Sequence, residues 1–336
     1  MQAPIFAELY RNDILESVHR GHAVVTHADG DILFESGDPS KIIFPRSSCK
    51  MIQALPLVES GAAARFKLNS QQLALSCASH NGEKMHTEGV TKWLNSLDLG
   101  EDDLRCGPQS PAHFEDQAAL HEAGQKPCRI HNNCSGKHSG FLTYNKHIGG
   151  GADYHEIGHP LQVAIKTAFE EMTEEASSGF GIDGCSAPNH TTSVRGLARA
   201  AASMSKGSSL GGVRGEAAKS LVEAMMLHPQ LVSGTKRACA DLMTAGKGKV
   251  AVKTGAEGVF VAILPERQIG VALKIECGTT RAAETAIAAL LCRLGVVLAS
   301  DPLVARYLHT PLHNFNKELV GSTKPSEVIW MSGQGI

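Results

Sequence analysis

The segment Lys41-Ile42-Ile43-Phe44-Pro45-Arg46-Ser47-Ser48-Cys49-Lys50 is the stretch around which this chain is organised. Its apolar first half predicts a strand, and the residues after it, 51–58, predict a helix that Pro56 would kink. Ser47 would stand at the entrance of this helix, with Lys50 three residues later on the same helical face. A lysine amine in that position can accept the serine's proton, provided that burial or nearby positive charge lowers its pKa.

The spacing alone does not identify a catalytic pair. Ser203 and Lys206 repeat it, as do Ser233 and Lys236, so the chain holds three Ser-x-x-Lys sites. A serine in this position is also a common helix N-cap, which is the simplest alternative for Ser47. The assignment therefore depends on the other motifs of the chain.

Length and charge limit the kind of protein this is. The 336 residues suffice for one large domain or two ordinary ones. A formal charge of −2 and a sequence without a basic run give no electrostatic reason to expect a nucleic-acid or membrane-surface partner. The start of the sequence lacks a signal-peptide pattern, and the most apolar stretch, 286–299, is too short to cross a bilayer. We therefore expect a cytoplasmic protein, whose nine scattered cysteines would be free thiols.

Strand-like segments lie at both ends of the sequence. Residues 24–28 and 32–35, joined by Asp29-Gly30-Asp31, have the pattern of a β-hairpin. Three more strands are predicted near the end of the chain, at 250–255, 259–264 and 269–274. Helices are predicted at 84–97, 160–175, 191–204, 215–228 and 280–294.

The order of these segments predicts an α+β fold, in which one antiparallel sheet is built from both ends of the chain. We expect a single domain, 1–336. The sheet would come from about 1–45 and 248–336, and a mostly helical part would span about 46–247. The active site would lie between the two.

Three short motifs, in order, have the chemistry of a serine amidase. They are Ser47-x-x-Lys50, Ser79-x-Asn81 and Lys253-Thr-Gly255, the last on a predicted strand. This ordered trio is typical of serine β-lactamases and penicillin-binding proteins, in which a lysine activates a nucleophilic serine and a second Ser/Lys pair passes protons. Ser79 follows Ser47 by only 32 residues, which is too few for the large helical subdomain that usually separates these motifs.

A second group of residues suits a metal ion. Cys134, Lys137 and His138 lie in the polar segment 131–140, which we expect to be a loop, and Cys185 lies in a later loop. Two thiolates and an imidazole are good Zn²⁺ ligands, although free cysteines beside capping polar residues would give the same pattern.

One metal-like motif is discounted. His155-Glu156-Ile157-Gly158-His159 matches the zinc-protease pattern, which requires both histidines on one continuous helix. Pro160 predicts that the helix begins only after His159, so both histidines would lie in the preceding loop. The sequence also has no Walker A motif and no Gly-x-Gly-x-x-Gly after a strand, so no nucleotide cofactor is expected.

The run His131-Asn-Asn-Cys-Ser-Gly-Lys-His138 resembles a signature of the rhizobial-type (class 3) L-asparaginases, also called the asparaginase II family. The resemblance covers nearly the full length of the chain. It continues at Phe44-Pro-Arg-Ser-Ser-Cys-Lys50, Cys77-Ala-Ser-His-Asn-Gly82, Asp183-Gly-Cys-Ser-Ala-Pro188 and Lys253-Thr-Gly-Ala-Glu-Gly258. Members of this family are similar in fold to serine β-lactamases and glutaminases, in agreement with strands at both ends of the chain.

The resemblance implies an L-asparagine amidohydrolase that releases L-aspartate and ammonia and has little activity on glutamine. It implies two Ser–Lys tandems, Ser47–Lys50 and Ser79–Lys253. We expect Ser47 to be the nucleophile, and Ser79 remains open as the alternative. Such enzymes are commonly homodimers, so a homodimer is expected here.

The resemblance also implies a zinc site formed by Cys134, Lys137 and Cys185, with water as the fourth ligand. The chemistry of the residues alone would favour His138 over Lys137 as a ligand, because a lysine must be neutral to bind a metal.

Four residues are the predicted substrate contacts. Arg46 is the candidate cation for the substrate's α-carboxylate, and Asp183 is the candidate anion for its ammonium. Asn81 and His138 complete the predicted set. Two alternatives stay open, namely another serine amidase or esterase of the β-lactamase-like fold and a non-enzymatic metal-binding protein.

Overall fold

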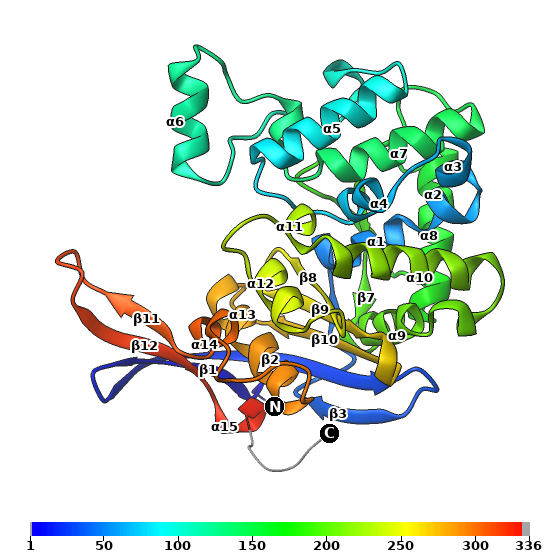
Figure 1. Cartoon of the computed structure of the whole chain (residues 1–336). Helices are drawn as coiled ribbons and strands as arrows, with labels where there is room; N and C mark the ends of the chain where they lie inside the picture. Colours follow the sequence, from blue (N-terminus) through cyan, green and yellow to red (C-terminus); the bar gives the residue numbers. More distant parts are fainter. Residues whose placement is uncertain (1, 331–336) are drawn as a thin grey trace.

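The computed structural model describes residues 2–330 and has a sheet at one end and a layered group of helices at the other (Figure 1). Residue 1 and residues 331–336, which the predicted domain 1–336 includes, lie outside the described residues. None of the helices in the described part of the chain combines the length and the apolarity needed to cross a bilayer.

The main sheet is built from both ends of the chain, as predicted. Its strand order is β11-β12-β1-β2-β10-β9-β8, with β3 paired to β2, and every neighbouring pair is antiparallel. The strands are β1 (Ile5–Arg11), β2 (Ile14–His27), β3 (Ile32–Ser36), β8 (Ala251–Gly255), β9 (Val259–Leu264), β10 (Ile269–Ile275), β11 (Thr310–His313) and β12 (Leu319–Pro325). This arrangement confirms the predicted α+β fold.

The long β2 strand joins the two halves of the sheet. It pairs with β1 along its first part and with β10 and β3 along its second part. The β2–β3 hairpin has the predicted turn, in which Asp29 Oδ1 accepts the backbone N–H of Asp31 at 3.0 Å and Gly30 has a φ of +104°. Glycine suits this position because side chains rarely adopt a positive φ.

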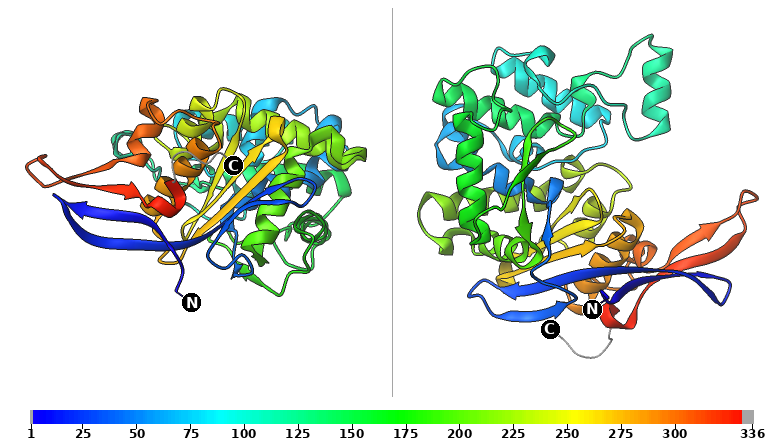
Figure 2. Two further views of the ribbon diagram at one scale, coloured as in Figure 1. Left: turned by 90° about the horizontal axis from the view of Figure 1, so that it is seen from below. Right: turned by 180° about the vertical axis from the view of Figure 1, so that it is seen from behind.

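Helices cover both faces of the sheet. Helix α9 (Val194–Ser205) packs on β2, β9 and β10, whereas α13 (Thr280–Arg293) packs on β1, β9, β10 and β12 from the other side (Figure 2). The α9 contact is close because Gly270 of β10 has no side chain. A Cβ at Gly270 would come within 2.7 Å of the backbone carbon of Ala201.

The helical part connects the N-terminal strands to β8 (Figure 1). Short strands β4 and β7 pair with each other, as do β5 and β6. The remaining elements are β4 (Ile42–Ile43), η1 (Arg46–Cys49), α1 (Lys50–Gln53), α2 (Leu55–Glu59), α3 (Ala62–Arg65), α4 (Ser70–Ser76), α5 (Lys84–Ser96), α6 (Phe114–Glu122), α7 (Ser135–Ile148), α8 (Pro160–Thr173), β5 (Phe180–Ile182), β6 (Pro188–His190), β7 (Thr192–Ser193), α10 (Gly212–Leu227), α11 (Pro229–Val232), α12 (Ala238–Ala245), α14 (Pro302–Leu308) and α15 (Glu327–Trp330).

The predicted helix over 51–58 is divided in two, α1 and α2. The break lies at Ala54, and Pro56 occupies the first turn of α2, where its missing N–H costs no helical hydrogen bond. The other predicted helices are present with ends shifted by a few residues. His159 is the N-cap of α8 and Pro160 its first residue, so His155 and His159 lie in the preceding segment, as predicted.

One prediction was wrong. Residues 131–140 are not a loop throughout, because Ser135 to Gly140 form the first turns of helix α7. This segment is rich in small residues because α7 packs closely against α4. A Cβ at Gly136 would come within 3.0 Å of the backbone carbon of Leu75, and one at Gly140 within 3.2 Å of Ser76 Cβ. Close helix packing, and not loop conformation, explains the glycines.

We predict that Gly270→Val destabilises the protein by about 3 kcal/mol, because the added atoms would force α9 away from the sheet. Urea unfolding measures this change. Gly158→Ala is the control: a Cβ at Gly158 meets open space, and its effect should stay within about 0.5 kcal/mol. Equal stability of the two variants would contradict the close contact of α9 with β10.

Candidate active site

The entrance to the first helix is strained. Arg46 has a positive φ of +54°, which is unfavourable for a residue with a side chain. Its guanidinium is tied to Asp183, whose Oδ1 accepts Nη2 at 2.8 Å and Nε at 3.1 Å. Asp183 also accepts the backbone N–H of Gly184. Strain of this kind accumulates at functional sites, where the surrounding structure maintains it.

Ser47 follows directly, in the 3₁₀ turn η1. The backbone N–H of Lys50 donates to the Ser47 carbonyl, and residues three apart in a 3₁₀ turn lie on the same side. Ser47 is partly exposed, and its hydroxyl has no hydrogen-bond partner among residues 2–330. Strand β8 lies against this turn, since a Cβ at Gly255 would come within 3.2 Å of the Ser48 nitrogen.

Ser79 lies between two buried lysines. Its Oγ accepts Lys50 Nζ at 2.9 Å and Lys253 Nζ at 2.8 Å. The amine of Lys50 has two further acceptors, the Ala78 carbonyl at 2.5 Å and Cys134 Sγ at 3.1 Å. Three acceptors match the three N–H groups of an ammonium. The structure thus brings both predicted lysines onto one serine, Ser79, which comes from the segment after α4.

The two lysines differ in their surroundings. Burial, with the nearby positive charges of Lys50 and Arg237, lowers the pKa of Lys253 to about 7. Near neutral pH a large fraction of Lys253 is therefore the free amine, and its lone pair can accept the proton of Ser79. An exposed lysine would be almost wholly protonated at the same pH.

The predicted metal ligands are also close together. Lys137 Nζ lies 3.0 Å from Cys185 Sγ, and Cys134 lies within hydrogen-bonding reach of Cys185 and 3.1 Å from Lys50 Nζ. A hydrogen bond from Cys134 and the positive charge of Lys137 hold the pKa of Cys185 well below that of an ordinary thiol. The group therefore offers a buried thiolate beside a second thiol and the Lys137 ammonium, which must lose its proton to bind a metal.

This donor set fits Zn²⁺, which binds sulfur and nitrogen ligands. Within residues 2–330, no group of three or more His, Cys, Asp and Glu side chains is placed to hold a metal ion, so a site here depends on Lys137. His138 instead shares a hydrogen bond of 2.8 Å between its Nδ1 and the Tyr154 hydroxyl. Burial lowers the pKa of His138 to about 4, so the ring is neutral.

The family described as L-asparaginase II matches residues 7–325. The chain belongs to this family. The match confirms the resemblance carried by the sequence motifs, and it identifies an asparaginase-type amidohydrolase.

No curated protein matches this L-asparaginase II family member. Among solved structures, a protein named Mglu has 14% identity over 84% of this chain and 68% of its own, with a TM-score of 0.47. A protein described as a β-lactamase from Bacteroides dorei DSM 17855 has 13% identity over 76% of this chain and 85% of its own, with a TM-score of 0.44. A β-lactamase from Mycobacterium bovis has 12% identity over 85% and 94%, with a TM-score of 0.36.

In this L-asparaginase II family member, Asn81 is engaged by the protein itself. Its Nδ2 donates to Glu83 Oε1 at 2.9 Å and to the Thr235 carbonyl at 3.1 Å, while its Oδ1 accepts Arg237 Nη1 at 3.0 Å. Glu83 also accepts the backbone N–H of Thr235 at 2.8 Å. The network fixes the segment after α11 against Ser79, whose N–H donates to the Val232 carbonyl.

The sequence motifs did not predict Glu83, Thr235 or Arg237 as part of this site. A signal was present, because Ser233 to Arg237 contain one of the three Ser-x-x-Lys repeats. The repeat itself is misleading, since Lys236 is exposed and Ser233 is buried without a side-chain partner among the described residues. The neighbouring Arg237 carries the contact and adds the positive charge that Lys253 experiences.

We predict that the stability cost of burying Lys253 depends on pH. Its pKa is about 7 in the folded protein and 10.5 in the unfolded chain. The unfolded state therefore binds more protons between these values, and wild-type stability should rise with pH across this window relative to Lys253→Met. Below pH 7 the cost is fully present, so Lys253→Met should be at least as stable as the wild type.

Urea unfolding at pH 6, 8 and 9.5 measures this difference. Lys249→Met, which removes an exposed lysine but keeps Lys253, is the control, and its difference in stability from the wild type should not depend on pH. A wild-type stability that tracks that of Lys253→Met at every pH would contradict the lowered pKa.

Proposed function

We propose that this protein hydrolyses the side-chain amide of L-asparagine to L-aspartate and ammonia. The observation that carries the proposal is the buried Lys50–Ser79–Lys253 chain, in which one amine has a pKa near neutrality. Membership of the L-asparaginase II family supports the amide as the reacting group. The proposal includes a cytoplasmic homodimer, as expected from the resemblance.

The Arg46–Asp183 pair is proposed to hold the amino-acid end of the substrate. An α-amino acid carries one carboxylate and one ammonium, and these two side chains offer the complementary charges 2.8 Å apart. The substrate's carboxylate would bind the Arg46 guanidinium, and its ammonium would bind Asp183. The pair is only partly exposed, with side-chain exposures of 29% and 13%, so binding there would be partly desolvated.

In the proposed mechanism, Ser47 Oγ attacks the amide carbon, and a bond between Oγ and that carbon forms. The Ser47 proton moves to Lys50 as Lys50 passes a proton to Ser79 and Ser79 passes its own proton to the neutral amine of Lys253. Backbone N–H groups near Ser47 would stabilise the oxyanion. The C–N bond then breaks, the relay returns a proton to the leaving ammonia, and water releases L-aspartate from the ester.

Direct attack by Ser79 is a second assignment. It is favoured by the two lysine contacts of Ser79 Oγ. The greater solvent exposure of Ser47 favours the first assignment. In this version Lys253 accepts the Ser79 proton directly, and the ammonium of Lys50 stabilises the developing negative charge.

We also propose that Cys134, Lys137 and Cys185 hold Zn²⁺. When bound, the ion would supply a fixed positive charge that orients a substrate group or polarises a carbonyl. The residues of the chain would contribute two sulfur donors and one amine, with His138 packed beside them and oriented by Tyr154.

We predict ammonia release from L-asparagine, with little or none from L-glutamine, at a rate that rises between pH 6 and 8. The reason for the rise is that Lys253 must be neutral to accept a proton and has a pKa of about 7. A coupled ammonia assay measures both substrates. Lys253→Arg, which stays protonated, should lower kcat by about 10²–10⁴-fold. If the protein releases no ammonia from L-asparagine but hydrolyses a chromogenic cephalosporin, the result would favour a different serine amidase or esterase.

A second prediction separates the two serines. A diazoketone analogue of asparagine should label Ser47 in the wild type, as read by peptide mass spectrometry. Ser79→Ala should keep this label at a reduced rate, because only the relay is lost, and Ser47→Ala should lose it. Labelling at Ser79 that survives Ser47→Ala would reverse the assignment.

A third prediction concerns zinc. Zn²⁺ binding must displace protons from Lys137, whose pKa is raised by the neighbouring Cys185 and Cys134 despite the opposing effect of burial, so the apparent affinity should increase with pH. Metal analysis should find about one zinc per chain in the wild type and in Cys277→Ser, an exposed control. Cys185→Ser should lose it. If the ion positions substrate, Cys185→Ser will raise KM and largely spare kcat. Equal zinc content in the wild type, Cys277→Ser and Cys185→Ser would contradict the zinc site.

A further inference from the structure

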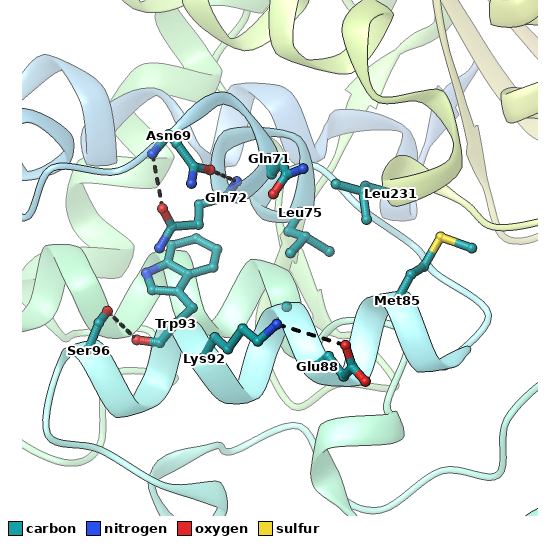
Figure 3. Close-up of a pocket in the computed structure, with 11 residues that line it drawn as sticks. Asn69, Gln71, Gln72, Leu75, Met85, Glu88, Lys92, Trp93, Ser96 and Leu231 are labelled. Carbon is teal, nitrogen blue, oxygen red and sulfur yellow. Dashed lines mark hydrogen bonds and ion pairs between the residues drawn. The ribbon is translucent and has the colours of Figure 1, made fainter.

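A cavity lies between helices α4, α5 and α11, outside the proposed active site (Figure 3). Its volume is about 370 Å³, which is within the range of small-molecule sites. Leu75 and Trp93 form an almost wholly buried floor, and Leu231 and Met85 add apolar surface beside it. Met85 is 38% exposed, so part of this apolar surface faces solvent.

The rim of this cavity carries both charges. Lys92 and Glu88 lie on α5, with Lys92 Nζ 3.9 Å from Glu88 Oε2. Their side-chain exposures of 80% and 50% mean that the pair is well solvated and weak, so either partner can be exchanged for a ligand group at little cost. The carboxamide of the exposed Gln71 also borders the cavity.

We propose that this cavity binds a free α-amino acid with an apolar side chain. The ligand's carboxylate would bind Lys92, its ammonium would bind Glu88, and its side chain would lie against Met85 and Leu231, above the buried Trp93 and Leu75. One cation beside one anion disfavours a nucleotide or another polyanion. The apolar floor disfavours sugars, and the small volume disfavours a peptide.

Two of the helices that form the cavity, α4 and α11, also hold the segment that carries Ser79. Helix α4 ends at Ser76, three residues before it, and α11 ends at Val232, whose carbonyl accepts the Ser79 N–H at 2.9 Å. Helix α5 is tied to α11 by a hydrogen bond of 2.9 Å between His86 Nε2 and the Gln230 carbonyl. Occupation of the cavity is therefore coupled to the position of Ser79, and the ligand acts as an effector. This coupling rests on the proposed function, whereas the binding does not.

Trp93 provides the measurement, because the chain has only two tryptophans and the second, Trp330, lies on α15 in a different part of the fold. Trp330→Phe leaves Trp93 as the single fluorophore. In that background we expect L-leucine and L-methionine to cause a saturable change in fluorescence, whereas isoamylamine and 4-methylpentanoate, which lack one charge each, should bind at least tenfold more weakly. Lys92→Gln should weaken L-leucine binding at least tenfold. The matched control is Lys84→Gln, which removes the other lysine beside Glu88 but does not line the cavity, and it should bind within twofold of the parent.

Several results would overturn the site: no saturable change, equal L-leucine binding by the Lys92→Gln and parent proteins, or displacement of L-leucine by L-aspartate, which would place the binding in the active site. Ammonia release with and without L-leucine tests the coupling separately. A changed KM or kcat in the wild type that is lost in Lys92→Gln supports it, and an unchanged rate with saturable fluorescence would overturn the effector role while leaving the site. If the protein has no amidase activity, the fluorescence titration still decides whether the cavity binds its ligand.

Discussion

The structure depends on the burial of two lysine amines around one serine hydroxyl. Lys50 and Lys253 have exposed fractions of 1% and 0%, and both contact Ser79 Oγ. Burying two cations side by side is unfavourable unless hydrogen bonds satisfy them or one loses its proton. Here both occur. Lys50 has three acceptors, while Lys253 has a pKa lowered to about 7.

The fold is what makes this burial possible. Lys50 lies at the start of α1, Ser79 follows α4, and Lys253 lies on β8 of the sheet. The N-terminal strands and β8 belong to one antiparallel sheet, in which the order β3-β2-β10-β9-β8 puts β3 and β8 at opposite edges, so the helical part between them spans the sheet from one edge to the other. This connection places Ser79 and Lys253, which are 174 positions apart, within hydrogen-bonding distance. The segment from α11 to α12 then fixes Ser79 from the other side, through Val232 and the Asn81–Glu83–Thr235 contacts.

Charge placement distinguishes the neighbouring groups of the site. Arg46 and Asp183 are ion-paired and partly open, which suits a zwitterionic substrate, whereas Cys134, Lys137 and Cys185 are buried and suit a metal. Lys50 contacts Cys134 as well as Ser79, so it links the sulfur group to the proposed proton relay. Because both groups are buried, a change in the charge of one shifts the pKa values of the other.

The sequence by itself determined the elements that have a local cause. Alternating strands, the Asp29-Gly30-Asp31 turn and the Pro160 helix start follow from side-chain period, turn chemistry and a fixed proline φ, and the motifs around Ser47, Ser79 and Lys253 identified the candidate chemistry. The tertiary structure alone decided that Lys50 contacts Ser79, that Asn81 is engaged by Glu83 and Arg237, and that Ser135 to Gly140 begin a helix. These features depend on which distant atoms meet. A lysine spacing is compatible with several partners, and glycines suit a tight helix contact as well as a loop until the packing neighbour is known.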